Sequence, residues 1–192
     1  PLDIPFRFKQ IGTNYSPALG FANRTGIREY AGGVRYRNRE LGWRWFDLQA
    51  TYSCITGLDN RMQSRENGIS TGINTATTDQ YYFRVYNYFE AVPTAFNLPN
   101  RVPVPVGNYS WTNINPHIET SNGRPYSAKL DVFCCNFYNG DYLKIDLQTD
   151  YRPNALIQLL PRYTYTHIDL PTGLVNIHLI SADLGVNFAP DM

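Results

Sequence analysis

Residues that most often carry chemistry are few in this chain and are widely spaced. The three histidines are His117, His167 and His178, and none of them stands in an HxH or HExxH spacing typical of metal sites. Asp146 and Asp150 can share one face of a strand, but a carboxylate pair hydrolyses glycosides only across a cleft of defined width. No nucleophile elbow, P-loop or glycine-rich dinucleotide motif is present. The sequence therefore predicts no enzyme, with no catalytic residue, no metal site and no cofactor.

The cysteines do not predict a disulfide framework. The chain has three of them, Cys54, Cys134 and Cys135, which is an odd number with two adjacent residues. Neighbouring residues of a strand point to opposite faces, so Cys134 and Cys135 should not share an environment. We expect all three to be small apolar fillers.

Five residues are predicted to contact a ligand or partner: Tyr15, Phe21, Arg24, Phe96 and Trp111. Four of them lie in the two longest links between predicted strands, and recognition residues concentrate on loops held by a rigid scaffold. Arg24 either pairs with an inward carboxylate, in a loop that folds over the mouth of a barrel, or lies in a solvated loop. The many Tyr and Trp residues either stack on sugars or form an interfacial girdle at strand ends.

Composition narrows the class of protein. Charged residues make up 17% of the 192 residues, below the roughly 25% of ordinary soluble domains, and aromatic residues reach 15%. The net charge is +1 and the basic residues are scattered, which does not suit a nucleic-acid binder. No run of about 18 apolar residues is present, so a transmembrane helix is not expected. Strands of a membrane barrel need only about 9–11 residues of alternating character and stay compatible with the sequence.

Period-two alternation predicts an all-β chain with antiparallel strands. Phe46, Leu48, Ala50, Tyr52 and Cys54 alternate with polar residues, and the same pattern returns elsewhere. Ten strands are predicted, with turns at Asn-Gly, Pro-Asn and Pro-Thr-Gly sequences. Their ranges are 2–10, 27–37, 43–55, 61–73, 80–90, 108–121, 125–136, 141–152, 155–167 and 174–188.

Alternation alone fits either a soluble sandwich with a dry interior or a membrane barrel with a wet one. The connections discriminate better. In a meander the two longest links, 11–26 and 91–107, both follow odd-numbered strands and must lie at one end, while the links at the other end are short. That asymmetry is typical of outer-membrane barrels, so we expect the apolar faces of 46–54 and 180–188 to point outward and Asp47, Gln49, Asp146 and Asp183 to point inward. The long links should then be extracellular.

Five motifs resemble, in order, those of a known family: NYSPALGFANRTGIR (14–28), GNYSW (107–111), FYNGD (137–141), YRPN (151–154) and IDLPTG (168–173). The first is similar to an N-P-x-x-G-F-x-x-R-x-x-x-R signature. The family is the outer-membrane β-barrel domain of unknown function that follows a family 9 carbohydrate-binding-like module in Gram-negative surface proteins. The resemblance implies that residues 1–192 are one barrel domain, incomplete at both ends, because the module is absent and further strands usually follow.

These expectations lead to one functional hypothesis and one alternative. The hypothesis is a non-enzymatic component of the outer membrane of a Gram-negative bacterium: a channel, an anchor or a subunit of an envelope assembly linked to glycan handling. Its partners are outer-membrane lipid and either other envelope chains or glycans, with no nucleic acid. The alternative is a soluble, secreted β-sandwich that binds or cleaves glycans.

Overall fold

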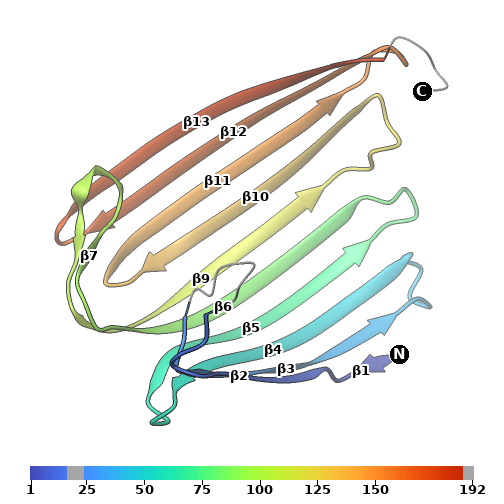
Figure 1. The fold of residues 1–192 in the computed structure, drawn as a ribbon. Coiled ribbons are helices and arrows are strands. Elements are labelled where there is room, and N and C mark those ends of the chain that lie inside the picture. Colours follow the sequence, from blue (N-terminus) through green and yellow to red (C-terminus); the bar gives the residue numbers. More distant parts are fainter. Residues whose placement is uncertain (17–23, 188–192) are drawn as a thin grey trace.

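The chain folds into one large, curved antiparallel sheet that resembles an open trough (Figure 1). The computed structural model describes residues 1–16 and 24–187, so Phe21 and Phe188 lie outside the described residues. The strands are β1 (Leu2–Asp3), β2 (Phe6–Ile11), β3 (Ile27–Asn38), β4 (Trp45–Gly57), β5 (Met62–Asn74), β6 (Gln80–Val92), β7 (Phe96–Asn97), β8 (Pro103–Val104), β9 (Gly107–Glu119), β10 (Tyr126–Phe137), β11 (Gly140–Tyr151), β12 (Ile157–Leu170) and β13 (Gly173–Val186).

The sheet is a meander in which each long strand pairs with the next along the chain. Its order is β1-β3-β4-β5-β6-β9-β10-β11-β12-β13, with β2 also paired to β3. The short strands β7 and β8 form a separate hairpin, and the three-residue 3₁₀ turn η1 (Pro99–Arg101) lies between them. No helix in the described residues is long and apolar enough to cross a membrane. The all-β antiparallel prediction is therefore confirmed.

The first predicted strand differs from the structure, and the predicted strand 61–73 is confirmed as β5. The first predicted strand is divided into β1 and β2, and Pro5 between them has no N–H to offer a ladder. Asn67-Gly68 is an Asn-Gly sequence inside β5 that could have formed a turn or a bulge, but both residues pair in register with β4 and β6. The register shift of β5 lies instead opposite Ile55 and Thr56.

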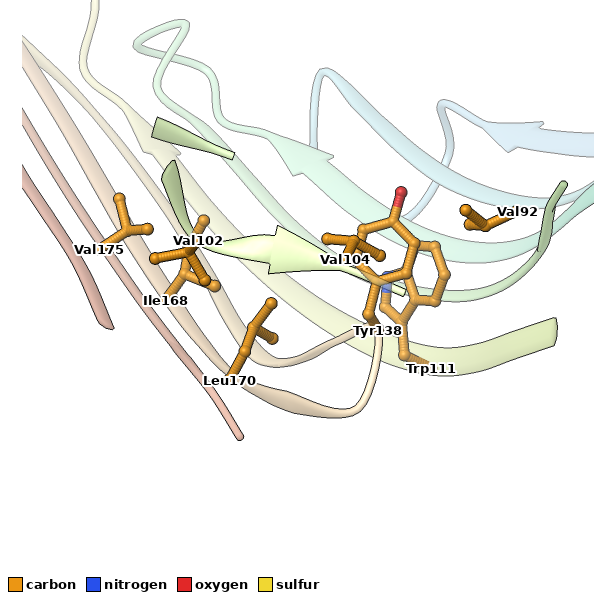
Figure 2. Close-up of a cluster of buried hydrophobic side chains, with 8 residues drawn as sticks. All are labelled: Val92, Val102, Val104, Trp111, Tyr138, Ile168, Leu170 and Val175. Atoms are coloured by element: carbon orange, nitrogen blue, oxygen red, sulfur yellow. The ribbon is translucent and has the colours of Figure 1, made fainter. Parts of the chain in front are cut away.

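The two faces of the sheet have opposite chemistry. Along β9, the alternate residues Trp111, Asn113, Asn115 and His117 are all buried, at 1–9% exposure, and three of these four are polar. Their side of the sheet is the concave one, where the buried cluster of Figure 2 lies. On the convex side, large apolar side chains are exposed, with Ile69 at 64%. This distribution is the reverse of that in a soluble domain.

Both edges of the sheet are unpaired among the described residues. One edge is β1 with β2, and the other is the 14-residue strand β13. Phe6 on the first edge is 76% exposed and Ile180 on the second is 82% exposed. The described strands therefore do not close into a barrel, and each edge offers free backbone N–H and C=O groups.

Candidate functional site

A line of polar residues crosses the concave face from β4 to β11. In register on adjacent strands, it consists of Asp47, Gly72, Tyr82, His117, Asp131 and Asp146, which we call the polar row. Alternation places these residues on one face, and the pairing of the strands brings them side by side. All of the polar row except Gly72 carries hydrogen-bonding or ionisable groups on a face that the sheet curves around.

Arginines from neighbouring strands neutralise the carboxylates at both ends of the polar row. At one end, Asp47 accepts Arg37 Nη2 at 2.7 Å and Arg35 Nε at 2.9 Å. At the other, Arg162 Nη2 donates to Asp146 Oδ2 over 2.6 Å. The guanidinium groups keep partial access to water while Asp47 and Asp146 are only 5–6% exposed. These contacts satisfy buried charge, which is costly to leave unpaired.

His117 stands in the middle of the polar row and contacts two carboxylates. Its Nδ1 lies 2.8 Å from Asp131 Oδ1, and its Nε2 lies 3.6 Å from Glu119 Oε2. Arg84 Nη1 is 3.7 Å from the same Asp131 oxygen and donates to Asn115 Oδ1 at 2.8 Å. No group of three or more His, Cys, Asp or Glu residues in the described part of the chain is arranged to hold a metal ion.

Towards the end of the sheet that carries the long links, the concave face changes from polar to aromatic and aliphatic. The Trp111 ring stacks on Tyr88 at 5.5 Å between centroids and lies 4.9 Å from the Tyr138 ring. Link 93–106, which we call the strap, runs over this surface and inserts two valines into it (Figure 2). Val102 is 6% and Val104 1% exposed, so the strap covers this end of the trough.

Hydrogen bonds fix the strap at both sides. The Tyr109 hydroxyl donates to the Pro105 carbonyl at 2.8 Å, and the Thr172 hydroxyl donates to the Pro103 carbonyl at 2.7 Å. Beyond Thr172, a Cβ on Gly173 would lie 3.1 Å from a methyl of Val102, at a φ of +148° that favours glycine. The strap therefore bridges from β9 to the β12–β13 hairpin, across three strand-to-strand spacings.

An ion pair joins the first long link to the end of β6, beside the strap. Arg24 Nη2 lies 3.5 Å from Glu90 Oε1, and Arg24 Nη1 donates to Ser64 Oγ at 3.2 Å. Glu90 is on the concave face, because it lies at every second position along β6 with Tyr88 and Tyr86 and therefore shares their face. Its other oxygen accepts the Tyr138 hydroxyl at 3.0 Å. Burial, reinforced by the Glu90 carboxylate, raises the pKa of Tyr138, which therefore stays a hydrogen-bond donor.

A cavity of about 830 Å³ opens next to this ion pair. Its walls come from Arg24 and Thr25, the strap, the β4–β5 link and the ends of β5, β6 and β9, and Phe96 supplies an aromatic ring that is 40% exposed. The residues around it include Arg24, Asp59, Arg61, Gln63, Glu90, Phe96 and Asn108. We call this cavity the mouth pocket.

The structure brings together only part of the predicted contact set. Arg24 and Phe96 line the mouth pocket, and Arg24 pairs with an inward carboxylate, which was one of the two alternatives that the sequence left open. Trp111 is 9% exposed and lies under the strap, next to Tyr138, rather than on the convex face. Tyr15 is 55% exposed and is not among the pocket residues, while Phe21 is not described.

Glu90 and Tyr138 were missed by the sequence reasoning. Strand parity could have placed Glu90 on the inward side of its strand, facing the links. Tyr138 stands in the two-residue turn between β10 and β11, where a large aromatic ring has no regular face, so no periodic pattern could reveal its position.

No family model, curated protein or solved structure matches this chain.

Proposed function

We propose that the chain is a section of the wall of an outer-membrane β-barrel in a Gram-negative bacterium, with no enzymatic role. The single observation that carries the proposal is the inversion of the two faces. Asp47, His117 and Asp146 are 5–6% exposed on the concave side, whereas Ile69, Leu184 and Ile180 are 64–82% exposed on the convex side. Lipid outside and water inside make such a distribution favourable.

The height of the convex apolar band supports this proposal. On β10 the outward residues run from Tyr126 to Cys134, and on β11 from Leu143 to Tyr151, in register with each other. Each segment is nine residues long, within the roughly 9–11 residues that cross a hydrocarbon core. Tyr126 and Tyr151 are 57% and 46% exposed at one border of the band, where an aromatic girdle is expected.

Polar side chains mark the other border of the band. They stand on the convex face near the long-link end and are Asn67, Asn87, Thr112, Asn136, Asp141 and Asp169. The first three are in register across β5, β6 and β9, and the last three across β10, β11 and β12. Such residues suit the headgroup level better than the acyl chains, so the band has a polar limit on this side.

The free edges set a requirement on partners. Lipid cannot hydrogen-bond the unpaired groups of β2 and β13, so in a membrane both edges need neighbouring strands. The nine long strands and the edge that β1 and β2 form together make ten antiparallel positions, so the two edges run in opposite directions, which suits an antiparallel closure. We propose outer-membrane lipid as one partner and envelope protein strands or glycans as others, in a channel, an anchor or an assembly subunit.

The pairing of the inward carboxylates supports a non-enzymatic role. Asp146 accepts Arg162, Gln148 and Thr164 together, which leaves it stabilised in its charged form rather than poised to donate a proton. A soluble sandwich, the alternative, needs two facing sheets. The described residues form one large sheet with a two-stranded hairpin above it.

Arginine substitutions on adjacent residues of β5 test the proposal. Ile69→Arg places a charge in the middle of the convex band, and Ser70→Arg is the matched control on the concave face. If the band contacts lipid, Ile69→Arg lowers the stability of the bilayer-inserted protein by about 2–4 kcal/mol and Ser70→Arg by much less. Urea unfolding in lipid vesicles measures both. Equal effects of the two variants, or a monodisperse protein without detergent, would overturn the membrane assignment.

A further inference from the structure

The mouth pocket has the side chains of a ligand site that the membrane assignment does not need. Its volume of about 830 Å³ lies within the roughly 300–1,000 Å³ of small-ligand sites. The formal charges around the pocket sum to zero, since Arg24 and Arg61 carry two positive charges and Asp59 and Glu90 carry two negative ones. A pocket without net charge does not favour an anion or a cation, so its ligand is expected to be neutral.

The pocket residues include both hydrogen-bond donors and acceptors. Glu90 and Asp59 offer carboxylate oxygens, Arg24 and Arg61 offer N–H groups, and the amides of Gln63 and Asn108 offer both. A ligand that uses such a wall must itself donate and accept at many points. Vicinal hydroxyl groups do so, because each hydroxyl carries one donor and two lone pairs.

Phe96 gives the pocket an apolar platform. Its ring is held edge-to-face against Tyr138, 6.0 Å between centroids, and 40% of the residue is exposed. Backbone pairing of Phe96 with Val104 holds it in place within the strap, because Val104 is buried against the sheet. The platform is therefore rigid before a ligand arrives, which lowers the entropic cost of binding. The C–H face of a pyranose ring matches a fixed aromatic surface of this kind.

From these features we infer that the mouth pocket binds a neutral oligosaccharide, with Phe96 as the stacking platform and Arg24, Gln63, Glu90 and Asn108 as hydrogen-bonding groups. The site is built by Arg24 and Thr25, the strap, the β4–β5 link and the ends of β5, β6 and β9, so it is present whether or not the convex face contacts lipid. The inference thus goes beyond the proposed barrel wall and stands or falls separately from it.

Titration of the detergent-solubilised protein with maltohexaose, cellohexaose and mannohexaose, followed by calorimetry, tests this inference. We expect saturable binding of at least one of them, weakened at least tenfold by Phe96→Ala. Phe83→Ala is the matched control, because Phe83 is 49% exposed on the convex face and its loss should change the affinity less than twofold. Gln63→Ala leaves the strap and its packing unchanged and should weaken binding at least threefold.

Three outcomes would overturn the inference: no saturable binding of any of the three sugars, equal loss in the Phe96 and Phe83 variants, or tighter binding of hexagalacturonate than of every neutral sugar. The Arg substitutions on β5 do not touch the pocket. A protein that binds sugar normally but tolerates Ile69→Arg in vesicles would retain the site and lose only the membrane assignment.

Discussion

Arg24 and Glu90, 66 positions apart in the sequence, meet at 3.5 Å between Nη2 and Oε1. Arg24 belongs to the first long link, and Glu90 stands near the end of β6, just before the strap. Their contact fastens the first link to the mouth of the trough on its concave side. The same carboxylate accepts the Tyr138 hydroxyl. The first long link, the β10–β11 turn and β6 therefore meet at Glu90.

The two partners of Glu90 should differ in their contribution to stability. Arg24 and Glu90 are 40% and 31% exposed, and a double-mutant cycle of Arg24→Ala with Glu90→Gln should give a coupling of about 0.2–1 kcal/mol. Tyr138 is 8% exposed, and Tyr138→Phe removes its hydrogen bond to a charged acceptor, at a cost of about 1.5–3 kcal/mol. Urea unfolding of the four variants measures both. A coupling larger than the cost of Tyr138→Phe would contradict this ranking.

Packing of the strap gives a second prediction. Val104 is 1% exposed, and its truncation to alanine should lower the free energy of unfolding by about 1.5–3 kcal/mol, because two buried methyl groups are lost. Val106→Ala, in the same link but 62% exposed, is the control and should change stability by less than about 0.5 kcal/mol. Limited proteolysis within 93–106 should also become faster in Val104→Ala only. Similar rates in both variants would mean that the strap is not held by its buried face.

A third prediction concerns pH and the end of the sheet opposite the strap. Asp79, in the β5–β6 link, accepts Arg124 Nη2, the Ser121 backbone N–H and the Thr77 hydroxyl, each at 2.8 Å. The hydrogen bond from Arg124, followed by those from Ser121 and Thr77, lowers the pKa of Asp79 from 3.8 to about 2. Because the folded pKa is depressed, Asp79 stabilises the protein fully above pH 3.8, and the stabilisation is lost as pH falls towards 2.

Asp79→Asn isolates this effect. The stability difference between wild type and Asp79→Asn should be constant above about pH 5 and shrink steadily as pH falls from about 4 to 2. Asp183→Asn is the matched control, since Asp183 forms no ion pair among the described residues. Urea unfolding at several pH values gives the two curves. A difference that grows on acidification would reverse the sign expected for a depressed pKa.

Much of the fold could be predicted from local pattern. Alternation in segments such as 141–152 sets which residues share a face whatever the strands pack against. The Asn-Gly sequence at 139–140 marks the hairpin between β10 and β11, although the turn itself consists of Tyr138 and Asn139, and Gly140 pairs with Phe137. Cys134 and Cys135 illustrate the rule, because they pair with Leu143 and Tyr142 on opposite faces. The parity of strands also placed both long links at one end before their conformation was known.

The candidate site could be predicted only in part, because several of its residues come from links and turns, where the sequence has no periodic pattern that would show which side chains meet. The sequence left open whether Arg24 pairs with an inward carboxylate or lies in a solvated loop, and it did not identify Glu90 as the partner. Burial of Trp111 depends on Val102 and Val104, which come from a link without alternation. The strap closes this end through contacts between residues far apart in the sequence, and these contacts determine which aromatic residues stay accessible.

The last prediction concerns orientation in the membrane. Links 12–26 and 93–106 lie at the same end of the sheet, and barrel loops are longer outside than inside, so this end should be extracellular. The two-residue turns 138–139 and 171–172 share that end, which makes a direct measurement necessary. Val106→Cys, at a position 62% exposed in the strap link, reports on the long-link end. Gly123→Cys reports on the other end, where a Cβ meets nothing closer than 3.6 Å.

Both cysteines are introduced singly after Cys54, Cys134 and Cys135 are replaced by serine, and intact cells are treated with a membrane-impermeant maleimide. We expect rapid labelling at position 106 and protection at position 123 until the outer membrane is permeabilised. Labelling at 123 with protection at 106 would invert the orientation while keeping the barrel. Protection at both positions before permeabilisation, with labelling at both afterwards, would remove the chain from the cell surface and leave the mouth pocket facing the periplasm.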